Sequence, residues 1–408
     1  MQRLIETGPH VGKPALTKAE ILITRRCQLR CSGCSIIRVD ENGKSDNAQS
    51  DREEIPMHQW NAVLENLRDV GCGFLAIYGA EPALVPQRVA SFVNYATNVV
   101  HIPNSVITSG IGLTEETLDL WWDNGLKSLT MSVDALVDSI AEQASNKSSR
   151  LKTDKAYHFL SYFSTKYGKE PSFRDIEGCQ TITLKNVKAI PELVRVLTDK
   201  GCWWHGDIVH WNRGQPYSKV EPLLDLKGLV FETDEDIALL RSVIEELIRM
   251  KDQGFLIHPS KVTLQDVINF GPKLTWQCCH NKEEFLGMCS IDPDGTVRIC
   301  DDLQPPELRP TLNSANSAPE DLGFVVSKGK LRLYEPSVKT LAAPIVHDPI
   351  YGWELSKRFE EFKDRAKVYV RKYNCTCSWS THQDAERIYS GRGVDLEHYV
   401  HRRIADTV

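Results

Sequence analysis

Short apolar segments alternate with longer amphipathic segments through the first half of the chain. The short segments are rich in Ile, Leu, Val and Thr and have the length of β-strands, whereas the longer segments repeat apolar residues at helical spacing. We predict strands at residues 19–25, 74–78, 105–108, 128–133 and 180–184. We predict helices at residues 57–67, 89–100, 115–124, 156–167 and 189–200.

Strands that alternate with helices in this way form βαβ units, whose strands run parallel. Six such units fit between about residue 15 and about residue 215, with the sixth strand near Trp203-Trp204-His205. The predicted fold class is therefore α/β, a partial (β/α)6 TIM-like barrel, in which loops at the carboxyl ends of the strands carry the chemistry. We expect Trp203, Trp204, His205, His210 and Trp211 to pack in the core or at a domain interface, and a substrate pocket is their alternative role.

The pattern changes in the second half of the chain. A strongly amphipathic helix is predicted at residues 236–251, and from Cys278 onward the chain is irregular and rich in cysteine. A proline- and serine-rich connector and a further predicted helix follow at residues 304–319 and 354–368. We expect an N-terminal segment, a partial barrel, a connecting helix region and a C-terminal module with its tail at residues 1–16, 17–232, 233–269 and 270–408.

Composition and charge narrow the class of protein. Hydrophobic residues make up 41% and charged residues 25% of the 408 residues, which is the composition of a folded globular protein. The formal net charge of −6 lacks the basic surplus of a dedicated nucleic-acid-binding protein. The chain has neither a signal-peptide pattern at its start nor an apolar run of about 18 residues, so we expect a cytoplasmic protein without a membrane partner.

The twelve cysteines are unevenly distributed. In a long chain without a secretion signal, clustered cysteines indicate metal or cluster ligation rather than disulfides. Cys72, Cys179 and Cys202 stand apart, and we expect them to be buried as small apolar side chains. The other nine form three groups, Cys27/Cys31/Cys34, Cys278/Cys279/Cys289/Cys300 and Cys375/Cys377.

The first group places three thiolates on a loop after the first predicted strand, in the segment Cys27-Gln-Leu-Arg-Cys31-Ser-Gly-Cys34. Three thiolates can hold three irons of a 4Fe-4S cluster and leave the fourth iron open to a cofactor or substrate. Zinc is the alternative, but a structural zinc site takes four ligands and no fourth cysteine or histidine lies nearby. The CxxxCxxC spacing after a strand resembles the signature of the radical SAM superfamily, although Gly33 stands where that family often has an aromatic residue.

Further segments resemble the positions at which this family contacts S-adenosylmethionine (SAM). Gly79-Ala80-Glu81-Pro82, at the end of the second predicted strand, resembles the GGEP motif, whose backbone and glutamate receive the methionyl amino group. Thr108 ends the third predicted strand, and Ser132 and Asp134 end the fourth, where the resemblance implies contacts to the ribose or carboxylate of SAM. Capping is the alternative role of Ser132 and Asp134. Asn186, after the fifth strand, is placed similarly.

The second cysteine group resembles the twitch/SPASM type of auxiliary-cluster domain. Cys279 is followed by fifteen residues and then by Gly295 and Cys300, which matches the C-x(9–15)-G-x4-C pattern of that family. The segment Ile291-Asp-Pro-Asp-Gly295 is predicted to form a turn with a left-handed glycine that closes a hairpin before Cys300.

The resemblance implies one auxiliary 4Fe-4S cluster, for which Cys279 and Cys300 supply ligands and Cys375 and Cys377 complete the set. Cys278 and Cys289 compete with Cys279 for a place in it. Whether Cys289 faces the cluster depends on the register of the hairpin, because a slip of one residue inverts the side-chain face, and a packed thiol is the equal alternative.

The resemblance as a whole implies an enzyme that cleaves SAM reductively to a 5′-deoxyadenosyl radical, abstracts hydrogen from its substrate, and performs oxidoreductase or isomerase-type chemistry. Only 26 residues precede Cys27, too few for the leader-binding domain of many peptide-modifying relatives, so we expect a small-molecule substrate such as a sugar, nucleoside or amino-acid derivative. A peptide-modifying maturase is the alternative. The expected partner is a reductant such as flavodoxin or ferredoxin. A non-catalytic iron-sulfur electron carrier or redox sensor is the alternative from another class, and it would not need the SAM-contact segments.

Overall fold

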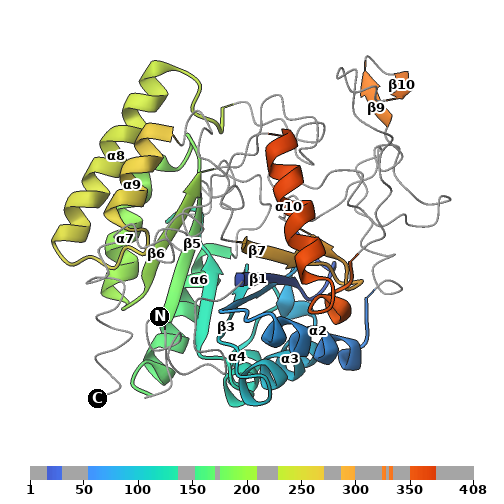
Figure 1. Cartoon of the computed structure of the whole chain (residues 1–408). Coiled ribbons are helices and arrows are strands. Elements are labelled where there is room, and N and C mark those ends of the chain that lie inside the picture. Colours follow the sequence, from blue (N-terminus) through green and yellow to red (C-terminus); the bar gives the residue numbers. More distant parts are fainter. Residues whose placement is uncertain are drawn as a thin grey trace.

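Six parallel strands form the centre of the fold (Figure 1). The computed structural model describes residues 16–29, 54–136, 152–170, 175–208, 228–270, 286–298, 324–327, 330–333 and 350–373. The strands lie in the order β6-β5-β4-β3-β2-β1, so each pairs with its neighbour in sequence. They are β1 (Leu16–Leu22), β2 (Leu75–Tyr78), β3 (Asn104–Thr108), β4 (Ser128–Ser132), β5 (Asp175–Ile182) and β6 (Trp203–Ile208).

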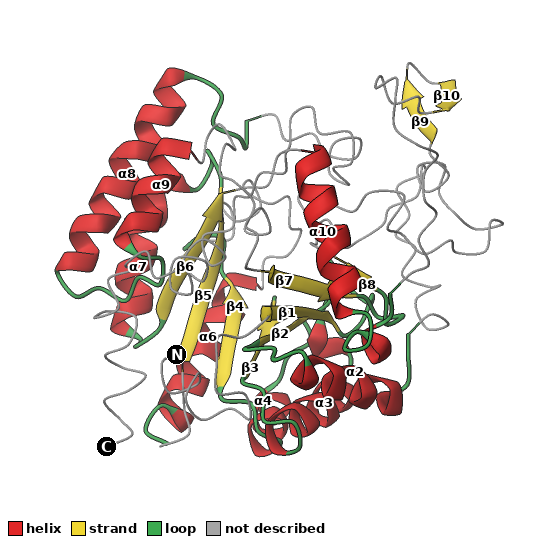
Figure 2. Cartoon of the chain, in the orientation of Figure 1, coloured by secondary structure: helices red, strands yellow, loops and turns green. Residues whose placement is uncertain are grey.

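Helices follow the strands and cover one face of the sheet (Figure 2). Because crossovers between parallel strands are right-handed, an uninterrupted strand order places every crossover helix on the same side. These helices are α2 (Met57–Asp69), α3 (Pro86–Asn98), α4 (Glu115–Asp123), α6 (Lys152–Tyr167) and α7 (Ile190–Asp199), followed by α8 (Asp234–Asp252) and α9 (Lys261–Phe270). The predicted α/β class and its partial barrel of six βα units are confirmed.

The two faces of the sheet differ in chemistry. Successive side chains of a strand point to opposite faces, and the outer, helix-covered face carries apolar residues such as Ile77, Val106 and Leu129, which are fully buried. Thr130, next to Leu129 in β4, points to the inner face, and it pairs in register with Glu177 of β5, so the inner face carries polar residues here. The core therefore lies between the sheet and its helices, and polar groups line the inside of the curved sheet.

Local sequence explains the helix boundaries. Helix α2 follows Pro56 and buries Trp60, Val63, Leu64 and Leu67, which recur at the spacing of one helix face. Helix α8 begins with a capping box, in which the Thr233 hydroxyl accepts from the backbone N–H of Asp236 and the Asp236 carboxylate accepts from that of Thr233. It therefore starts at Asp234, two residues before the predicted start.

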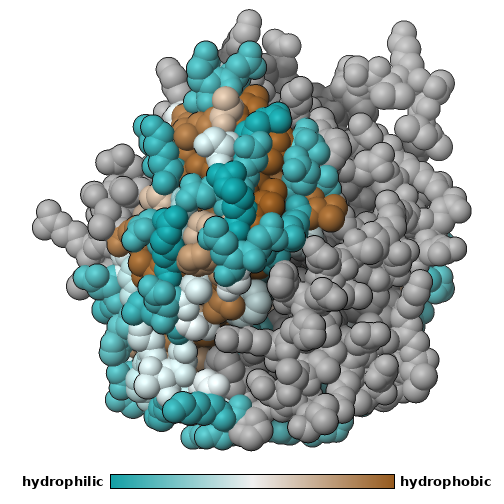
Figure 3. All heavy atoms as spheres, turned by 90° about the vertical axis from the view of Figure 1, so that its left-hand side faces the viewer, coloured by the Kyte–Doolittle hydropathy of each residue, from teal (hydrophilic) through white to brown (hydrophobic). Residues whose placement is uncertain are grey.

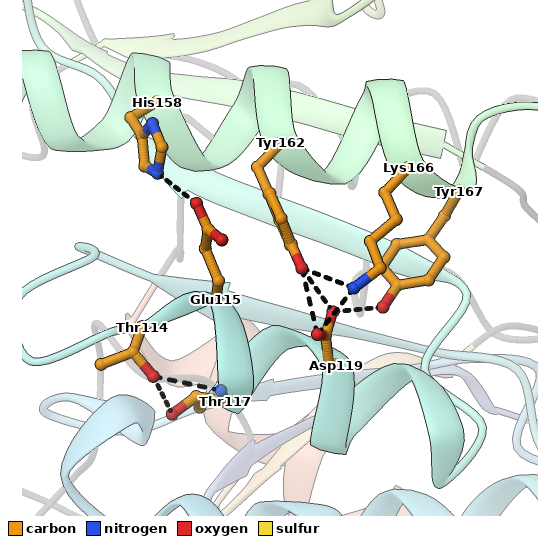
Figure 4. Close-up of polar contacts among 8 residues, drawn as sticks. All are labelled: Thr114, Glu115, Thr117, Asp119, His158, Tyr162, Lys166 and Tyr167. Carbon is orange, nitrogen blue, oxygen red and sulfur yellow. Dashed lines mark hydrogen bonds and ion pairs between the residues drawn. The ribbon is translucent and has the colours of Figure 1, made fainter.

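Helices α4 and α6 are joined by a polar cluster around Asp119 (Figure 4). The Asp119 carboxylate accepts hydrogen bonds from the hydroxyls of Tyr162 and Tyr167 and from the Lys166 ammonium, at 2.7 Å for the last. Partial burial raises the pKa of Asp119, but these hydrogen bonds outweigh it and the pKa lies below its ordinary value. The cluster connects two neighbouring βα units on the outside of the barrel.

A seventh strand, β7 (Leu286–Ile291), extends the sheet beyond β1, with which it pairs in parallel, and β8 (Val297–Arg298) pairs antiparallel with β7. Gly295 adopts φ +84° between these strands, so the predicted hairpin with a left-handed glycine is confirmed. The sequence pattern did not indicate that this hairpin joins the barrel sheet. The division of the chain into four parts stays a prediction.

The remaining described elements are η2 (Pro82–Leu84), η3 (Val187–Ala189), η8 (Gly352–Glu354), α10 (Phe359–Tyr373) and the hairpin of β9 (Phe324–Ser327) and β10 (Lys330–Leu333). Helix α10 starts five residues later than the predicted helix and is preceded by the single turn η8.

The face formed by α8 and α9 presents mainly hydrophilic residues with hydrophobic ones between them (Figure 3). Val262 of α9 is 44% exposed and is one of two large apolar side chains exposed among the described residues. None of the described helices is both long enough and apolar enough to cross a membrane.

Candidate functional site

Cys27 lies five residues after the end of β1, at the carboxyl edge of the parallel strands. Its side chain is partly exposed, and the backbone N–H of Leu29 donates to its Sγ at 3.3 Å. Amide hydrogen bonds of this kind stabilise a thiolate that ligates an iron-sulfur cluster. The other predicted cluster ligands lie outside the described residues, namely Cys31, Cys34, Cys279, Cys300, Cys375 and Cys377.

Glu54 anchors the backbone that leads to Cys27. Its buried carboxylate accepts from the Thr24 hydroxyl at 2.7 Å and from the backbone N–H of Arg25 at 3.0 Å. Its second oxygen pairs with the Arg88 guanidinium, which also donates to the backbone carbonyl of Ile23 at 3.4 Å. The Glu54 carboxylate and its partner Arg88 together thus hold three successive residues at the start of the cysteine loop.

Gly79 and Ala80 continue the pairing of β2 with the end of β1. The backbone N–H of Ala80 donates to the carbonyl of Thr24 at 3.0 Å. A Cβ on Gly79 would lie 2.7 Å from that same carbonyl oxygen, closer than real Cβ contacts come. The glycine is therefore required by the close approach of two strands, and it brings the predicted SAM-contact segment beside the residues that precede Cys27.

Glu81 ties the end of β2 to the end of β3. Its carboxylate is 1% exposed and accepts hydrogen bonds from the backbone N–H groups of Ala83 at 3.1 Å and Ser109 at 3.0 Å, and from the hydroxyls of Thr108 and Ser109. A carboxylate offers about four acceptor positions, and these four donors occupy them. Thr108 and Glu81, both predicted to lie near SAM, therefore contact each other directly.

Ser132 and Asp134 follow one another at the carboxyl end of β4, where Ser132 is partly exposed and Asp134 is buried. The backbone carbonyl of Asp134 accepts from the side-chain amides of Gln180 and Asn186, each at 2.9 Å. Asn186 is fully buried, and its Oδ1 also accepts from the backbone N–H of Thr183 at 2.8 Å. Asn186 thus links the ends of β4 and β5, and Ser132 is the more accessible of the two predicted SAM contacts at this edge.

A second group of polar residues lies on the inner face at β5 and β6. The carboxylate of Glu177 lies 2.8 Å from Nδ1 of His258 and 4.0 Å from Nδ1 of His205. Nε2 of His205 lies 3.0 Å from Oδ2 of Asp207. Burial lowers the pKa of His205, but the charge of Asp207 and contacts with Asp207 and Cys179 outweigh it and raise the pKa well above its ordinary value.

The tryptophans of β6 divide between the faces. Trp204 is fully buried and its Nε1–H donates to the side-chain oxygen of Gln180 at 3.0 Å, which agrees with the packing interpretation. Trp203 and His205 lie on the inner face. His210 and Trp211 lie outside the described residues.

The isolated cysteines were predicted to be buried, and two of the three are. Burial raises the pKa of the Cys72 and Cys202 thiols to about 12, so both stay protonated. Cys179 is only partly buried. Cys289, for which cluster ligation and packing were equal alternatives, is fully buried in β7 opposite Ala19 of β1, and burial raises its thiol pKa well above the ordinary value. Its position favours packing.

Sequence reasoning missed Glu54 and Arg88, which come together from different parts of the chain, and it missed the inner-face group of Glu177, Asp207 and His258. The spacing of His205 and Asp207, two residues apart in Trp203-Trp-His-Gly-Asp207, was a signal that this strand has a polar face.

Comparison with known proteins places part of the chain in a described family. Residues 21–156 match the model of the Radical SAM superfamily. Over 137 residues the chain is 28% identical to PqqA peptide cyclase from Rhizobium meliloti (strain 1021), and this match covers 34% of the chain and 33% of the cyclase. The chain thus matches about a third of the length of this curated relative.

One solved structure with low sequence identity shares the fold, and another is similar at a lower TM-score. The crystal structure of SuiB from Streptococcus suis is similar with a TM-score of 0.50 and 14% identity, over 70% of this chain and 60% of SuiB. A structure of anSMEcpe with bound AdoMet and Kp18Cys peptide has a TM-score of 0.44 and 15% identity, over 70% of this chain and 74% of that chain.

Proposed function

Since residues 21–156 match the model of the Radical SAM superfamily, we propose that this protein is a radical SAM enzyme that modifies a peptide. The observation that carries the proposal is the meeting of two segments at one edge of the sheet. The backbone that leads to Cys27 is hydrogen-bonded through Thr24 to Ala80, within the segment that resembles the SAM-binding motif. An electron carrier would not need this second segment beside its cysteines.

The residues fit a 4Fe-4S cluster and SAM. Cys27 lies partly exposed on a loop at the carboxyl edge of the strands and its sulfur already accepts an amide hydrogen bond. When bound by Cys27, Cys31 and Cys34, the cluster supplies the electron that splits SAM into methionine and a 5′-deoxyadenosyl radical. Glu54 holds the start of this loop in place.

SAM would lie along the ends of β2, β3 and β4. We assign its contacts to the Gly79–Pro82 segment, Thr108, Ser132 and Asp134. Because four donors already occupy the Glu81 carboxylate, Glu81 serves mainly as a positioning residue that fixes the backbone of Gly79 and Ala80 toward SAM. Thr108 acts with it, as the hydroxyl that joins β3 to this carboxylate.

A peptide is the substrate class that the relatives support. PqqA peptide cyclase, as its name states, acts on a peptide, and the 28% identity to this chain falls on 137 residues. The expectation of a small molecule depended on the number of residues ahead of Cys27, which says nothing about a peptide presented by another protein. We therefore place the peptide-modifying maturase ahead of the small-molecule enzyme.

An auxiliary 4Fe-4S cluster and an external reductant complete the proposal. The turn of the β7–β8 hairpin, which precedes Cys300, lies beside the segment that precedes Cys27, because Arg25 Nη2 is 3.3 Å from Asp294 Oδ2. Cys279, Cys300, Cys375 and Cys377 would hold an auxiliary cluster, which would supply a second centre for electron transfer, and a flavodoxin or ferredoxin is the proposed reductant.

The substrate class can be tested with reconstituted enzyme, SAM, dithionite and the low-mass fraction of an extract from the host cells. We expect this fraction to stimulate 5′-deoxyadenosine formation, and we expect prior digestion of the fraction with a broad-specificity protease, later inactivated, to abolish the stimulation. Stimulation that survives digestion would refute a peptide substrate and return a sugar, nucleoside or amino-acid derivative to first place. A Cys27→Ala variant controls for SAM breakdown that does not depend on the cluster.

A further inference from the structure

Three side chains converge on one point on the inner face of the sheet, at the end of the sheet formed by β5 and β6. Glu177 belongs to β5, His205 to β6, and His258 to an extended segment that continues the sheet beyond β6, where the His258 N–H donates to the Trp204 carbonyl at 2.8 Å. We propose that Glu177, His205 and His258 form a binding site for one divalent metal ion of the zinc class, separate from the cysteine clusters.

The geometry suits a metal ion. One ligand atom from each of the three residues lies within 4.8 Å of the other two. Ligands at 2.0–2.1 Å around tetrahedral zinc lie about 3.3 Å from one another. The distances from the Glu177 carboxylate to Nδ1 of His258 and of His205, 2.8 Å and 4.0 Å, lie on either side of that value. Small side-chain movements would therefore suffice to bring these atoms to coordination distance.

Asp207 contacts the ring nitrogen of His205 that would not bind the metal. A histidine that ligates zinc through one ring nitrogen commonly presents the other to a carboxylate, which fixes the tautomer and the ring orientation. His205 directs Nε2 to Asp207 Oδ2 at 3.0 Å, which leaves Nδ1 on the side of Glu177. The arrangement carboxylate–imidazole–metal would then run along the inner face of β6.

Burial and charge favour a cation at this point. Glu177, His205 and Asp207 are 9%, 7% and 6% exposed. Imidazoles that ligate a metal ion are neutral, so the two carboxylates would then contribute two negative charges in a place poor in water, which is costly unless a cation balances them. A divalent ion balances both charges.

Two histidines and one carboxylate are also a ligand set of catalytic zinc sites, in which the fourth coordination position stays open to water or substrate. Cys179 and Thr181 lie on the same face of β5 toward its carboxyl end; Cys179 is partly exposed and Thr181 is exposed, so that side of the site is accessible. Ser132 pairs in register with Cys179, one layer nearer the carboxyl edge than Glu177. The open position therefore faces the end of the barrel where we place SAM and substrate, and an oxygen of the substrate could occupy it.

The alternative is that the four side chains form only a network of ion pairs, with protonated histidines between carboxylates. Zinc titration of the full-length protein decides between them. The iron-sulfur clusters are first reconstituted so that the cysteines are occupied, loosely bound metal is removed on a chelating resin, and bound zinc and iron are counted after desalting. We expect about one zinc per chain in the wild type, and the iron count should not change.

Variants then locate the zinc. We expect Glu177→Gln and His258→Gln to lose it, and Asp207→Asn to bind it about 10- to 100-fold more weakly. His158→Gln, at an exposed histidine that pairs with Glu115, should bind zinc like the wild type. Zinc binding that is equal in the wild type and in His258→Gln would overturn the proposal, as would a wild type that binds none.

X-ray absorption at the zinc edge gives a readout that does not depend on whether the variants fold. We expect a first shell of nitrogen and oxygen alone at about 2.0–2.1 Å in the wild type. A sulfur shell at about 2.3 Å would place the zinc on cysteines and refute the site. Because neither measurement uses SAM or substrate, failure of this proposal would leave the proposed enzyme function standing.

Discussion

Replacement of Glu81 by alanine tests how the barrel holds its SAM-binding edge. The carboxylate is 1% exposed and joins the end of β2 to the end of β3 through four donors. Alanine removes every acceptor at once. The Thr108 and Ser109 hydroxyls can rotate toward other acceptors, but the backbone N–H groups of Ala83 and Ser109 are held in position by the chain.

The expected loss of folding stability follows from those two N–H groups. Each buried donor that loses its acceptor costs about 1–3 kcal/mol, so Glu81→Ala should destabilise the fold by about 2–6 kcal/mol. Each kcal/mol lowers the melting temperature of a domain of about 150–250 residues by about 2–4 °C. The expected fall is therefore about 4–24 °C, with the lower part of the range if water enters the space.

Thermal unfolding of the anaerobically reconstituted protein, followed by circular dichroism, measures this effect. Glu245→Ala, on an exposed position of α8, is the matched control and should change stability by no more than about 0.5 kcal/mol. Glu81→Gln keeps one acceptor oxygen and should fall between the wild type and Glu81→Ala. If Glu81→Ala had the same melting temperature as the Glu245→Ala control, the carboxylate would not join the strands and the assignment of Glu81 as a positioning residue would be wrong.

Three further substitutions test other parts of the structure. Gly79→Ala places a Cβ 2.7 Å from the Thr24 carbonyl oxygen, so it should lower the free energy of unfolding by about 1–3 kcal/mol and reduce SAM cleavage. An unchanged melting temperature and an unchanged rate of SAM cleavage would contradict the close approach of the two strands. Cys289→Ala should leave the iron count unchanged, whereas Cys300→Ala should remove about four irons per chain, and iron analysis that showed the reverse would exchange their roles. Asp119→Asn should lower stability at neutral pH by about 0.5–1 kcal/mol without affecting SAM cleavage. Because the folded-state pKa of Asp119 lies below 3.8, the difference should persist above about pH 4 and disappear as the pH falls through that folded-state value; a difference in melting temperature that grew in acid would refute the assignment.

The alternation of strands and helices was predictable because the helix-covered face of each strand and the inward face of each helix are apolar. Strand β5 shows where this signal fails. Its pattern predicted a start at Gln180, yet the strand begins at Asp175. The inner face of the barrel is polar, so Asp175 and Glu177 resemble loop residues, and only the pairing with β4 shows that they belong to a strand.

The candidate site was predictable where chemistry is local in sequence. Cys27 and the Gly79–Pro82 segment were expected at the ends of the first two strands, and they lie there because those motifs directly follow apolar runs. Contacts between segments that are far apart in the sequence have no such local pattern. The pairing of Glu54 with Arg88 depends on the three-dimensional path of the chain, and the convergence of Glu177 with His258 depends on the register of three extended segments.

The central claim is that Cys27 and its neighbours support reductive cleavage of SAM, and one measurement tests it most directly. Anaerobically reconstituted wild type and Cys27→Ala are incubated with SAM and dithionite, and 5′-deoxyadenosine is quantified by chromatography. We expect the wild type to form 5′-deoxyadenosine and methionine in equal amounts, and we expect Cys27→Ala to form no more than the protein-free control. Equal 5′-deoxyadenosine from the wild type and from Cys27→Ala, or none from a wild type that carries its iron, would contradict the account.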